Sequence, residues 1–290
     1  MNLNQELKNI VVMYHAHCPD GMAAAWTAWK KFGYDASYIP ISNRNTPPDD
    51  LVNRDIYILD FCFPSEILKS LHVTNNKVIV LDHHISSQLD AVSIPGGIFD
   101  QTKSGAGMTW DYFFPGEKRP KLLNYIEIGD LNPRNLPPGE FLSQRIIATP
   151  FTIDAYDKII NRYEKDQFGV EYEGEVIGLY VNHLFEIAVE DYDLVLFEGY
   201  TIPAINIALP LTTKSQLLAL LIDRVPPMAM SYRYQNGYWK VSIRGNGSVD
   251  CALLASKYGG GGHKNSAGFI VKADGPLPFA SFESDKKVID

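Results

Sequence analysis

Asp82, His83 and His84 end a run of apolar residues, 78–81, whose composition is typical of a buried parallel strand. A buried strand carries apolar side chains until it leaves the sheet. A carboxylate and two imidazoles at its carboxyl end therefore lie where open α/β sheets bind ligands. Carboxylate oxygens and imidazole nitrogens are ligands for divalent metal ions, so the triplet indicates metal chemistry.

Carboxylates and imidazoles recur at three other points where an expected strand or helix ends. They are His15, His17 and Asp20 after the first strand, Asp60 at the end of the third strand, and Asp130 near the end of a helix. Because the carboxyl ends of parallel strands meet at one crevice, we expect these side chains to converge. Taken singly, an Asp at a strand end is more often a helix cap, and Asp130-Leu131-Asn132-Pro133 reads as a helix end and turn. Four such clusters at one edge favour a metal site.

The number of ligand-type groups exceeds what one ion needs. It predicts two ions about 3.5–4 Å apart, the spacing used for in-line phosphoryl transfer. Oxygen and nitrogen ligands without thiolates suit Mn²⁺, Mg²⁺, Zn²⁺ or Co²⁺. Asp60 is the natural bridging ligand, because it comes from an interior strand between the other clusters.

Strands alternate with helices in the first half of the chain, which predicts a doubly wound, mainly parallel α/β sheet with helices on both faces. The expected strands are residues 10–14, 34–41, 55–61, 77–84 and 96–100, and the expected helices are 20–33, 64–71, 104–114 and 122–130.

A smaller C-terminal α/β domain is expected from about residue 195. It contains a strong hairpin signal at Asn236-Gly237. We predict a catalytic, metal-binding domain over 1–165, a helical connector over 166–194 and a substrate-binding domain over 195–290. The expected strands are 200–208, 228–234, 238–244 and 268–271, and the expected helices are 214–223 and 249–257.

Four consecutive glycines end at Gly262 in this second domain. Glycines let a backbone approach a ligand closely and present N–H groups to an anion, although a plain flexible loop is the alternative. The candidate substrate-binding residues are Gly260, Gly261, Gly262, His263, Lys264 and, at the end of a strand, Arg244. Arg244 suits a phosphate fork or, equally well, is a surface cation.

The composition limits which classes of substrate and binding partner the protein can have. The 290 residues are 46% hydrophobic and 21% charged, with a net charge of −8. Proteins that coat long nucleic acid usually have a basic surface, so a long duplex is a poor substrate and a short or small phosphorylated molecule a better one. The chain has three scattered cysteines, two of them in the motifs, where a small side chain fits. The first residues show no signal-peptide pattern, and no apolar run is long enough to span a membrane. These observations predict a cytoplasmic protein. A homodimer is compatible with the chain.

The chain resembles the DHH phosphoesterases. The resemblance rests on the segments YHAHCPDGMAAAW, YILDF, VIVLDHH and IEIGDLN in the first domain and GGGGHKNSAGF in the second, which span roughly residues 10–132 and 240–271. It implies a DHH domain facing a smaller domain across a cleft. It also implies two ions, most often Mn²⁺, and hydrolysis by a metal-bridging hydroxide.

The resemblance also implies roles for individual residues. His15 and Asp20 would bind one ion, His83 and Asp130 the other, and Asp60 would bridge. His84 would face the scissile phosphate, and Asp82 would be a ligand or would orient a His. Gly260–His263 and Arg244 would bind the rest of the substrate, especially its terminal phosphate.

The first motif departs from the family pattern, which has a His and two Asp. Only Asp20 is present, and His17 or Met22 occupies the other acidic position. If His17 replaces the carboxylate as a ligand, Mn²⁺, Co²⁺ or Zn²⁺ would be favoured over Mg²⁺.

The favoured substrate is a short oligonucleotide, hydrolysed by an exonuclease or nanoRNase-like activity. The alternatives are a phosphatase of pAp, polyphosphate or cyclic dinucleotides, and a nucleotide-binding protein with weakened catalysis. The aromatic residues 232, 234, 238 and 239 either stack on bases or pair across the hairpin.

Overall fold

The computed structural model describes residues 7–42, 46–131, 141–275, 277 and 279–281. It divides into two compact units, Met1–Gly178 and Leu179–Asp290. None of the helices in these ranges is long and apolar enough to cross a membrane.

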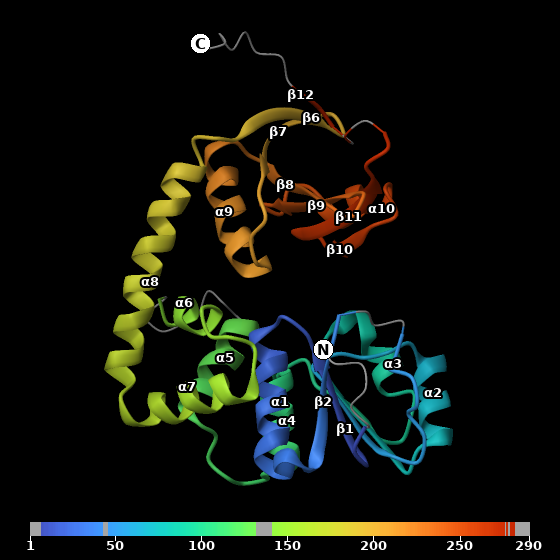
Figure 1. Ribbon diagram of the computed structural model, residues 1–290. Coiled ribbons are helices and arrows are strands. Elements are labelled where there is room, and N and C mark those ends of the chain that lie inside the picture. The colour runs from blue at the N-terminus through green and yellow to red at the C-terminus, as the bar shows by residue number, and fades with distance from the viewer. Residues whose placement is uncertain (1–6, 43–45, 132–140, 276, 278, 282–290) are drawn as a thin grey trace. The chain divides into compact units, whose positions relative to one another are not determined.

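A parallel sheet of five strands forms the centre of the first unit (Figure 1). Its spatial order is β2-β1-β3-β4-β5, and every neighbouring pair is parallel. The strands are β1 (Ile10–His15), β2 (Ala36–Ile41), β3 (Asp55–Leu59), β4 (Lys77–Asp82) and β5 (Gly97–Phe99). The expected mainly parallel α/β fold is confirmed.

Helices cover both faces of this sheet. Successive residues of a strand point to opposite faces, so each strand contributes side chains to both helical layers. Val12 and Tyr14 pack with one set of helices, and Val11 and Met13 pack with the other. The first set is α1 (Pro19–Phe32), α4 (Gly105–Phe113), α5 (Lys121–Leu131), α6 (Phe141–Ile147) and α7 (Ile153–Lys165). The second set is α2 (Ser65–Thr74) and α3 (Gln88–Ala91), with short 3-10 turns at η1 (Gly33–Asp35) and η2 (Ile85–Ser87) elsewhere in the unit.

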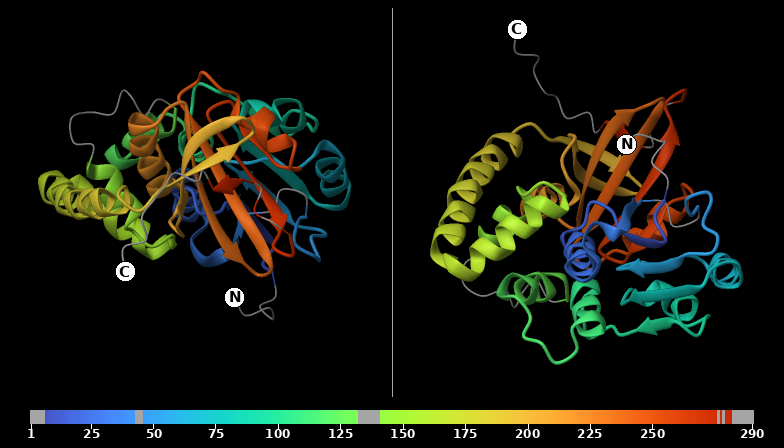
Figure 2. Two further views of the ribbon diagram at one scale, coloured as in Figure 1. Left: turned by 90° about the horizontal axis from the view of Figure 1, so that it is seen from above. Right: turned by 60° about the horizontal axis from the view of Figure 1, so that its bottom comes forward.

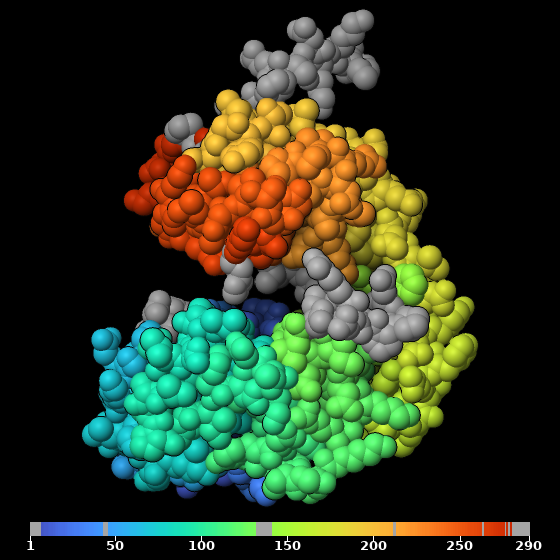
Figure 3. All heavy atoms as spheres, turned by 180° about the vertical axis from the view of Figure 1, so that it is seen from behind, coloured from blue at the N-terminus to red at the C-terminus, as the bar shows by residue number. Residues whose placement is uncertain are grey.

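The helix α8 (Gln167–Ala188) begins in the first unit and ends in the second. It buries Val170 against the first unit and Phe185 against the second. Large apolar side chains are also exposed along it, at residues 168, 172, 176, 179, 180, 184 and 187. In the space-filling view α8 lies at the surface (Figure 3). An exposed apolar stripe of this length often marks an interaction site, and the expected homodimer stays a prediction.

The second unit is built on a seven-stranded sheet, whose strands are coloured yellow to red in Figure 2. Its order is β10-β11-β9-β8-β7-β6-β12, and only β7 and β8 run parallel. The strands are β6 (Asp193–Phe197), β7 (Tyr200–Asn206), β8 (Met228–Gln235), β9 (Tyr238–Gly245), β10 (Gly261–His263), β11 (Ser266–Lys272) and β12 (Ala280–Ser281).

One face of this sheet packs against α10 (Cys251–Ser256) through a core that includes Met230, Ile243 and Phe269. The other face packs against α9 (Leu211–Arg224), whose Leu217 and Leu221 are fully buried. The predicted hairpin is present as β8 and β9, joined at Asn236 and Gly237, both with positive φ. The strands β6, β10 and β12 were not expected. The strands β10 and β12 are short and form the two edges of the sheet, and β6 lies beside β12.

Candidate metal centre

Candidate ligands gather at the carboxyl edge of the parallel sheet, where the strand order reverses. The chain passes from β1 to β2 on one side and then to β3 on the other, so β1 and β3 flank the switch point at which open α/β sheets bind ligands. His15 is the last residue of β1, and Asp60 directly follows β3. Asp82 is the last residue of β4.

His83 lies among three carboxylates. Its Nε2 is 3.1 Å from Asp60 Oδ1, 3.4 Å from Asp130 Oδ2 and 3.8 Å from Asp20 Oδ2. These residues come from β3, α5, α1 and the end of β4, which are far apart in sequence. The structure thus brings together His83, Asp60, Asp130 and Asp20, as the strand-end argument predicted.

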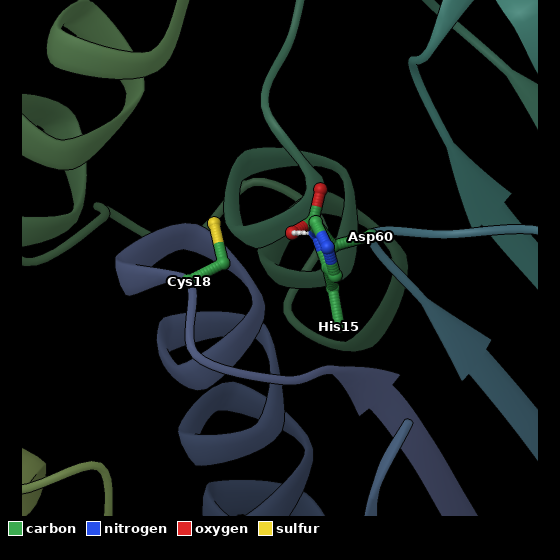
Figure 4. A group of neighbouring side chains, drawn as sticks. All are labelled: His15, Cys18 and Asp60. Atoms are coloured by element: carbon green, nitrogen blue, oxygen red, sulfur yellow. Dashed lines mark ion pairs between the residues drawn. The ribbon is translucent and has the colours of Figure 1, made fainter. Parts of the chain in front are cut away.

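His15 approaches Asp60 from the other side. Its Nδ1 is 3.3 Å from Asp60 Oδ2, and both atoms are buried without a hydrogen-bond partner among the described residues. Figure 4 shows His15 and Asp60 beside Cys18, which lies at the start of α1. Ligand atoms of these three residues lie within 4.8 Å of one another. Buried polar atoms without hydrogen-bond partners are rare in proteins. Two such atoms facing each other are expected where a cation binds.

Asp20 also tethers two helix starts. Its Oδ2 accepts a hydrogen bond from the backbone N–H of Gly105 at 2.6 Å, and its Oδ1 from that of Ala106 at 3.0 Å. A carboxylate is favoured at the N-terminus of a helix such as α4, where backbone N–H groups lack partners. Asp20 therefore fixes α4 against the start of α1 as well as facing His83.

Asp82 is fully buried and turned toward His84 rather than toward the other carboxylates. Its Oδ1 accepts hydrogen bonds from the backbone N–H groups of His83 and His84 and from Nδ1 of His84, the last at 2.7 Å. Its Oδ2 accepts a short hydrogen bond from the hydroxyl of Ser87. This pattern fits a residue that orients His84.

Two backbone features allow the side chains to meet. Asp60 has a φ of 63°, a left-handed conformation that Asp adopts more readily than most residues. Gly105 lies against it: a Cβ at this position would be 2.4 Å from Asp60 Cβ. A side chain at residue 105 would therefore push Asp60 or the start of α4 out of place.

The charges of the centre shift one another's pKa values. Burial and the charges of Asp60 and Asp130 raise the pKa of Asp20 well above its usual range. Burial opposes ionisation of Asp60, but the close approach of His15 and the hydrogen bond to His83 prevail and lower its pKa. Burial lowers the pKa of His83, but the Asp60 hydrogen bond and the surrounding carboxylates raise it to about 9. Burial and the charge of Asp60 raise the pKa of Asp130. Such a surplus of close carboxylates is relieved by a bound cation.

The side chains at this edge of the sheet form three groups whose ligand atoms could each hold a metal ion, and they fit a metal centre. One is His15, Cys18 and Asp60, a second is Asp60, His83 and His84, and a third is Asp20, His83 and Asp130. Asp60 belongs to two of them, whereas the first and the third have no residue in common. Asp60 is absent from the third group, but its Oδ1 lies 3.1 Å from Nε2 of His83, which belongs to that group.

The first motif contains a candidate ligand, Cys18, that was not expected from the sequence. His17 is exposed, has a φ of 57° and belongs to none of these groups, whereas Cys18 does. Burial and the charges of Asp60 and Asp20 raise the pKa of the Cys18 thiol well above its usual range. Cys18 is therefore a candidate ligand that the prediction of a site without thiolates did not include. The available signal was its position two residues before Asp20 in the first motif.

The candidate substrate-binding residues lie in the second unit. Arg244 is half-buried, and its guanidinium donates to Ser215 Oγ and to the Ile243 carbonyl. Gly260 and Gly262 are required by packing, because a Cβ at either would fall within 2.4 Å of neighbouring backbone or side-chain atoms of β11. Gly261 faces open space, and Lys264 is exposed. The backbone of His263 ends β10, but its side chain lies outside the described part of the structure.

The aromatic residues of the hairpin mainly contact one another. Trp239 packs edge-on against Tyr232 and Tyr234, with ring centroids 5.9 and 5.7 Å apart. This favours the cross-strand pairing alternative over base stacking for these rings.

Comparison with known proteins bears on this architecture. Residues 219–284 match the family model of the DHHA1 domain. The resemblance to the DHH phosphoesterase family is confirmed. "Uncharacterized protein R106" of Acanthamoeba polyphaga mimivirus is 25% identical over 305 residues, covering 93% of this chain and 69% of that protein.

Two solved structures share the DHH-type fold. One is the exonuclease RecJ bound to manganese, with a TM-score of 0.51 and 14% identity, covering 90% of this chain and 85% of RecJ. The other is the pGpG-specific phosphodiesterase PggH from Vibrio cholerae, with a TM-score of 0.50 and 13% identity, covering 92% and 94% of the two chains. At these identities the likeness establishes the fold, and the chemistry has to be argued from the residues of this chain.

Proposed function

We propose that this protein is a metal-dependent phosphoesterase that hydrolyses phosphodiester bonds of short oligonucleotides. The observation that carries the proposal is the convergence of His15, Asp60, His83 and Asp130 on a buried edge of the sheet, with Asp60 within reach of two histidines. A strand end with a purely structural role does not require so many ligand-type side chains close together at the switch point of a doubly wound sheet.

The two ion sites are assigned to the two groups that share no residue. His15, Cys18 and Asp60 would hold one ion, and Asp20, His83 and Asp130 the other. Asp60 Oδ1, which lies 3.1 Å from Nε2 of His83, would contribute to the second ion as well. When bound, divalent ions supply a nucleophile at neutral pH and neutralise negative charge on the phosphoryl group. Mn²⁺ is our first choice, and a sulfur ligand favours Mn²⁺, Co²⁺ or Zn²⁺ over Mg²⁺.

His84 is assigned to the phosphate. Because the Asp82 carboxylate can only accept hydrogen bonds, Nδ1 of His84 carries a proton and Nε2 faces away from Asp82. The side chain of His84 is 25% exposed, so Nε2 is accessible to a substrate. When Nε2 also carries a proton, His84 can donate to a phosphoryl oxygen that gains charge in the transition state.

The second unit is assigned to the remainder of the substrate. Arg244 and the residues Gly260–Lys264 supply cations and close backbone approach. The net charge of −8 argues against a long duplex and for a small substrate bound by local cations.

The test is turnover by protein stripped of metal and then supplied with Mn²⁺. We expect release of mononucleotides from a labelled dinucleotide or 5-mer, with parallel assays on pAp, a cyclic dinucleotide and polyphosphate to define the substrate. Asp60→Asn keeps a residue that tolerates positive φ and should abolish turnover on every substrate while leaving the fold intact. Wild-type rates in that variant, or binding of all these substrates without turnover by the wild-type protein, would contradict the proposal.

A further inference from the structure

Two carboxylates from other helices bind the N-terminus of α4. The backbone N–H groups of Gly105 and Ala106 donate to Asp20 of α1. The backbone N–H of Ser104, the residue that caps α4, donates to Oε2 of Glu127 at 3.0 Å. Glu127 lies on α5, so the start of α4 is joined to both α1 and α5. Both carboxylates thus satisfy N–H groups that have no partner within the helix.

Each of the two joined helices also carries a candidate metal ligand. Asp20 is itself one, and Asp130 follows Glu127 by three residues on α5. Residues three apart are neighbours on one side of a helix. Asp20 and Asp130 belong to one ligand group with His83, whereas Glu127 belongs to none of the three groups. The start of α4 therefore connects the helices that carry two ligands of the same group.

Glu127 is itself fixed by an ion pair. Its Oε1 accepts a hydrogen bond from Nη1 of Arg119 at 2.7 Å, and the same guanidinium donates to both carboxylate oxygens of Asp111 on α4. The side chains of Glu127 and Arg119 are only 20% and 17% exposed. A planar guanidinium that bridges two carboxylates fixes the positions of both. Arg119 thus connects α4 to α5 a second time.

The backbone of α4 packs directly against the Glu127 carboxylate. A Cβ at Gly107 would overlap Oε2 of Glu127 and would lie 2.9 Å from Nη1 of Arg119. Ser104 is fully buried beside them, and its hydroxyl accepts a hydrogen bond from the N–H of Gly107. Because this contact leaves no room for a side chain, a shift of Glu127 requires a shift of α4 or of α5.

Loss of the Glu127 hydrogen bond would loosen α5 more than the rest of the metal centre. The hydrogen bonds to Asp20 and the close approach of Gly105 to Asp60 would still fix the start of α4. Asp130, by contrast, is carried by α5. Carboxylates that lie close together repel one another, so their arrangement needs support from outside the ligand group. Asp130 is the ligand whose position depends most on Glu127.

We propose that Glu127 is a positioning residue for the second metal ion, the one assigned to the group that contains Asp130. Glu127 does not bind the ion. It sets the distance between α4 and α5 and thereby the affinity for this ion, whereas the ion assigned to the group with Cys18 depends on other contacts. Hydrogen-bonding partners of ligands commonly act on metal affinity in this indirect way. The inference rests on the two-ion assignment of the proposed function, but its test measures metal binding without turnover.

The experiment titrates the metal-stripped full chain with Co²⁺, following both the heat of binding and the sulfur-to-cobalt absorption expected from Cys18. In Glu127→Ala we expect one ion to bind as in the wild-type protein, with the absorption retained. The other ion should bind about tenfold or more weakly. Glu127→Gln guards against misfolding as an explanation, because it preserves size. Its amide oxygen can accept from Ser104 or from Arg119 but not from both, so the same ion should bind more weakly by a smaller factor.

Glu173→Ala is the matched control. Glu173 belongs to the same unit, accepts hydrogen bonds from Arg145 and Arg162 at 2.8 and 2.7 Å, and is in none of the three ligand groups. Whatever its effect on the unfolding temperature, this variant should bind both ions as the wild-type protein does.

Four results would overturn the inference. They are wild-type affinity for both ions in Glu127→Ala and Glu127→Gln, equal weakening of both ions in these variants, the same selective loss in Glu173→Ala, and uptake of a single ion by the wild-type protein.

Failure of the proposed function has a different signature. If the wild-type protein binds two ions but releases no mononucleotide, and Glu127→Ala weakens one ion selectively, the positioning role stands and the hydrolase does not. If the wild-type protein hydrolyses the dinucleotide and Glu127→Ala keeps wild-type affinity for both ions, the hydrolase stands and the positioning role does not.

Discussion

Asp82 Oδ1 accepts a hydrogen bond from Nδ1 of His84 at 2.7 Å, and the remaining bonds of Asp82 go to Ser87 and to the backbone N–H groups of His83 and His84. These hydrogen bonds outweigh burial and lower the pKa of Asp82. Asp82 therefore stays ionised and determines which nitrogen of His84 carries its proton, without itself belonging to a group of ligands.

Asp82→Asn should separate orientation of His84 from metal binding. We expect kcat to fall by about 10- to 100-fold, because the amide no longer fixes the ring in one tautomer. The bound metal, measured by elemental analysis, should be unchanged. Asp60→Asn is the contrasting variant, since it should lose metal as well as turnover. Loss of metal in Asp82→Asn would assign Asp82 to the ligands instead.

The close approach of Gly105 to Asp60 gives a second prediction. In Gly105→Ala the new Cβ would start 2.4 Å from Asp60 Cβ and must displace it. We expect the free energy of unfolding to fall by about 1–3 kcal/mol and metal affinity to fall with it. Gly275→Ala is the control, because a Cβ there meets no atom within 4 Å. Equal stability of the two variants in denaturant titrations would show that the start of α4 yields freely.

The convergence of candidate ligands could be predicted because parallel strands make their carboxyl ends neighbours whatever separates them in sequence. His83 was expected beside Asp60, and the structure has them 3.1 Å apart. Cys18 could not be compared with His17 from the sequence, because the positions of both side chains depend on the left-handed turn at His17. Periodicity alone does not report such a turn.

The second unit was harder to anticipate. A cation pair such as Arg233 and Lys240 becomes visible only when the hairpin register places the two residues opposite each other. Lys214 joins them from α9, and neither composition nor any local motif connects it to β9. The short strands β10 and β12 carry too few residues for alternation to be recognised.

Substitutions in the first motif should show which residue binds metal. With Co²⁺ bound, the wild-type protein should show a sulfur-to-cobalt charge-transfer absorption, because Cys18 Sγ lies with His15 and Asp60 in one ligand group. Cys18→Ser should remove this absorption and shift metal preference toward Mg²⁺.

Two further variants complete that test. Cys62→Ser, at a buried cysteine outside the three groups, and His17→Ala, at an exposed residue, should both retain the absorption and the metal content. Persistence of the absorption in Cys18→Ser, or lower metal content in His17→Ala, would restore His17 as the candidate ligand.

The lowered pKa of Lys214 predicts that phosphate binding and protein stability depend on pH in opposite directions. Burial and the charges of Arg244 and Arg233 bring its pKa from 10.5 to about 8, and Lys214 lines a cavity of about 440 Å³ together with Arg233 and Lys240. An anion binds the protonated form, so affinity for inorganic phosphate should fall as pH rises from about 8, by at most about tenfold per pH unit. In the same window the unfolded chain binds more protons at this residue than the folded chain, so the Lys214 contribution to stability rises with pH.

Lys214→Arg checks this assignment, because a guanidinium stays protonated throughout the window. The variant should bind phosphate with an affinity that no longer falls between about pH 8 and 10.5, and its binding enthalpy should no longer depend on the ionisation enthalpy of the buffer. The wild-type protein, by contrast, should take up a proton on binding above its lowered pKa. A wild-type phosphate affinity that is flat across this window, or the same decline in Lys214→Arg, would mean that another group governs the site.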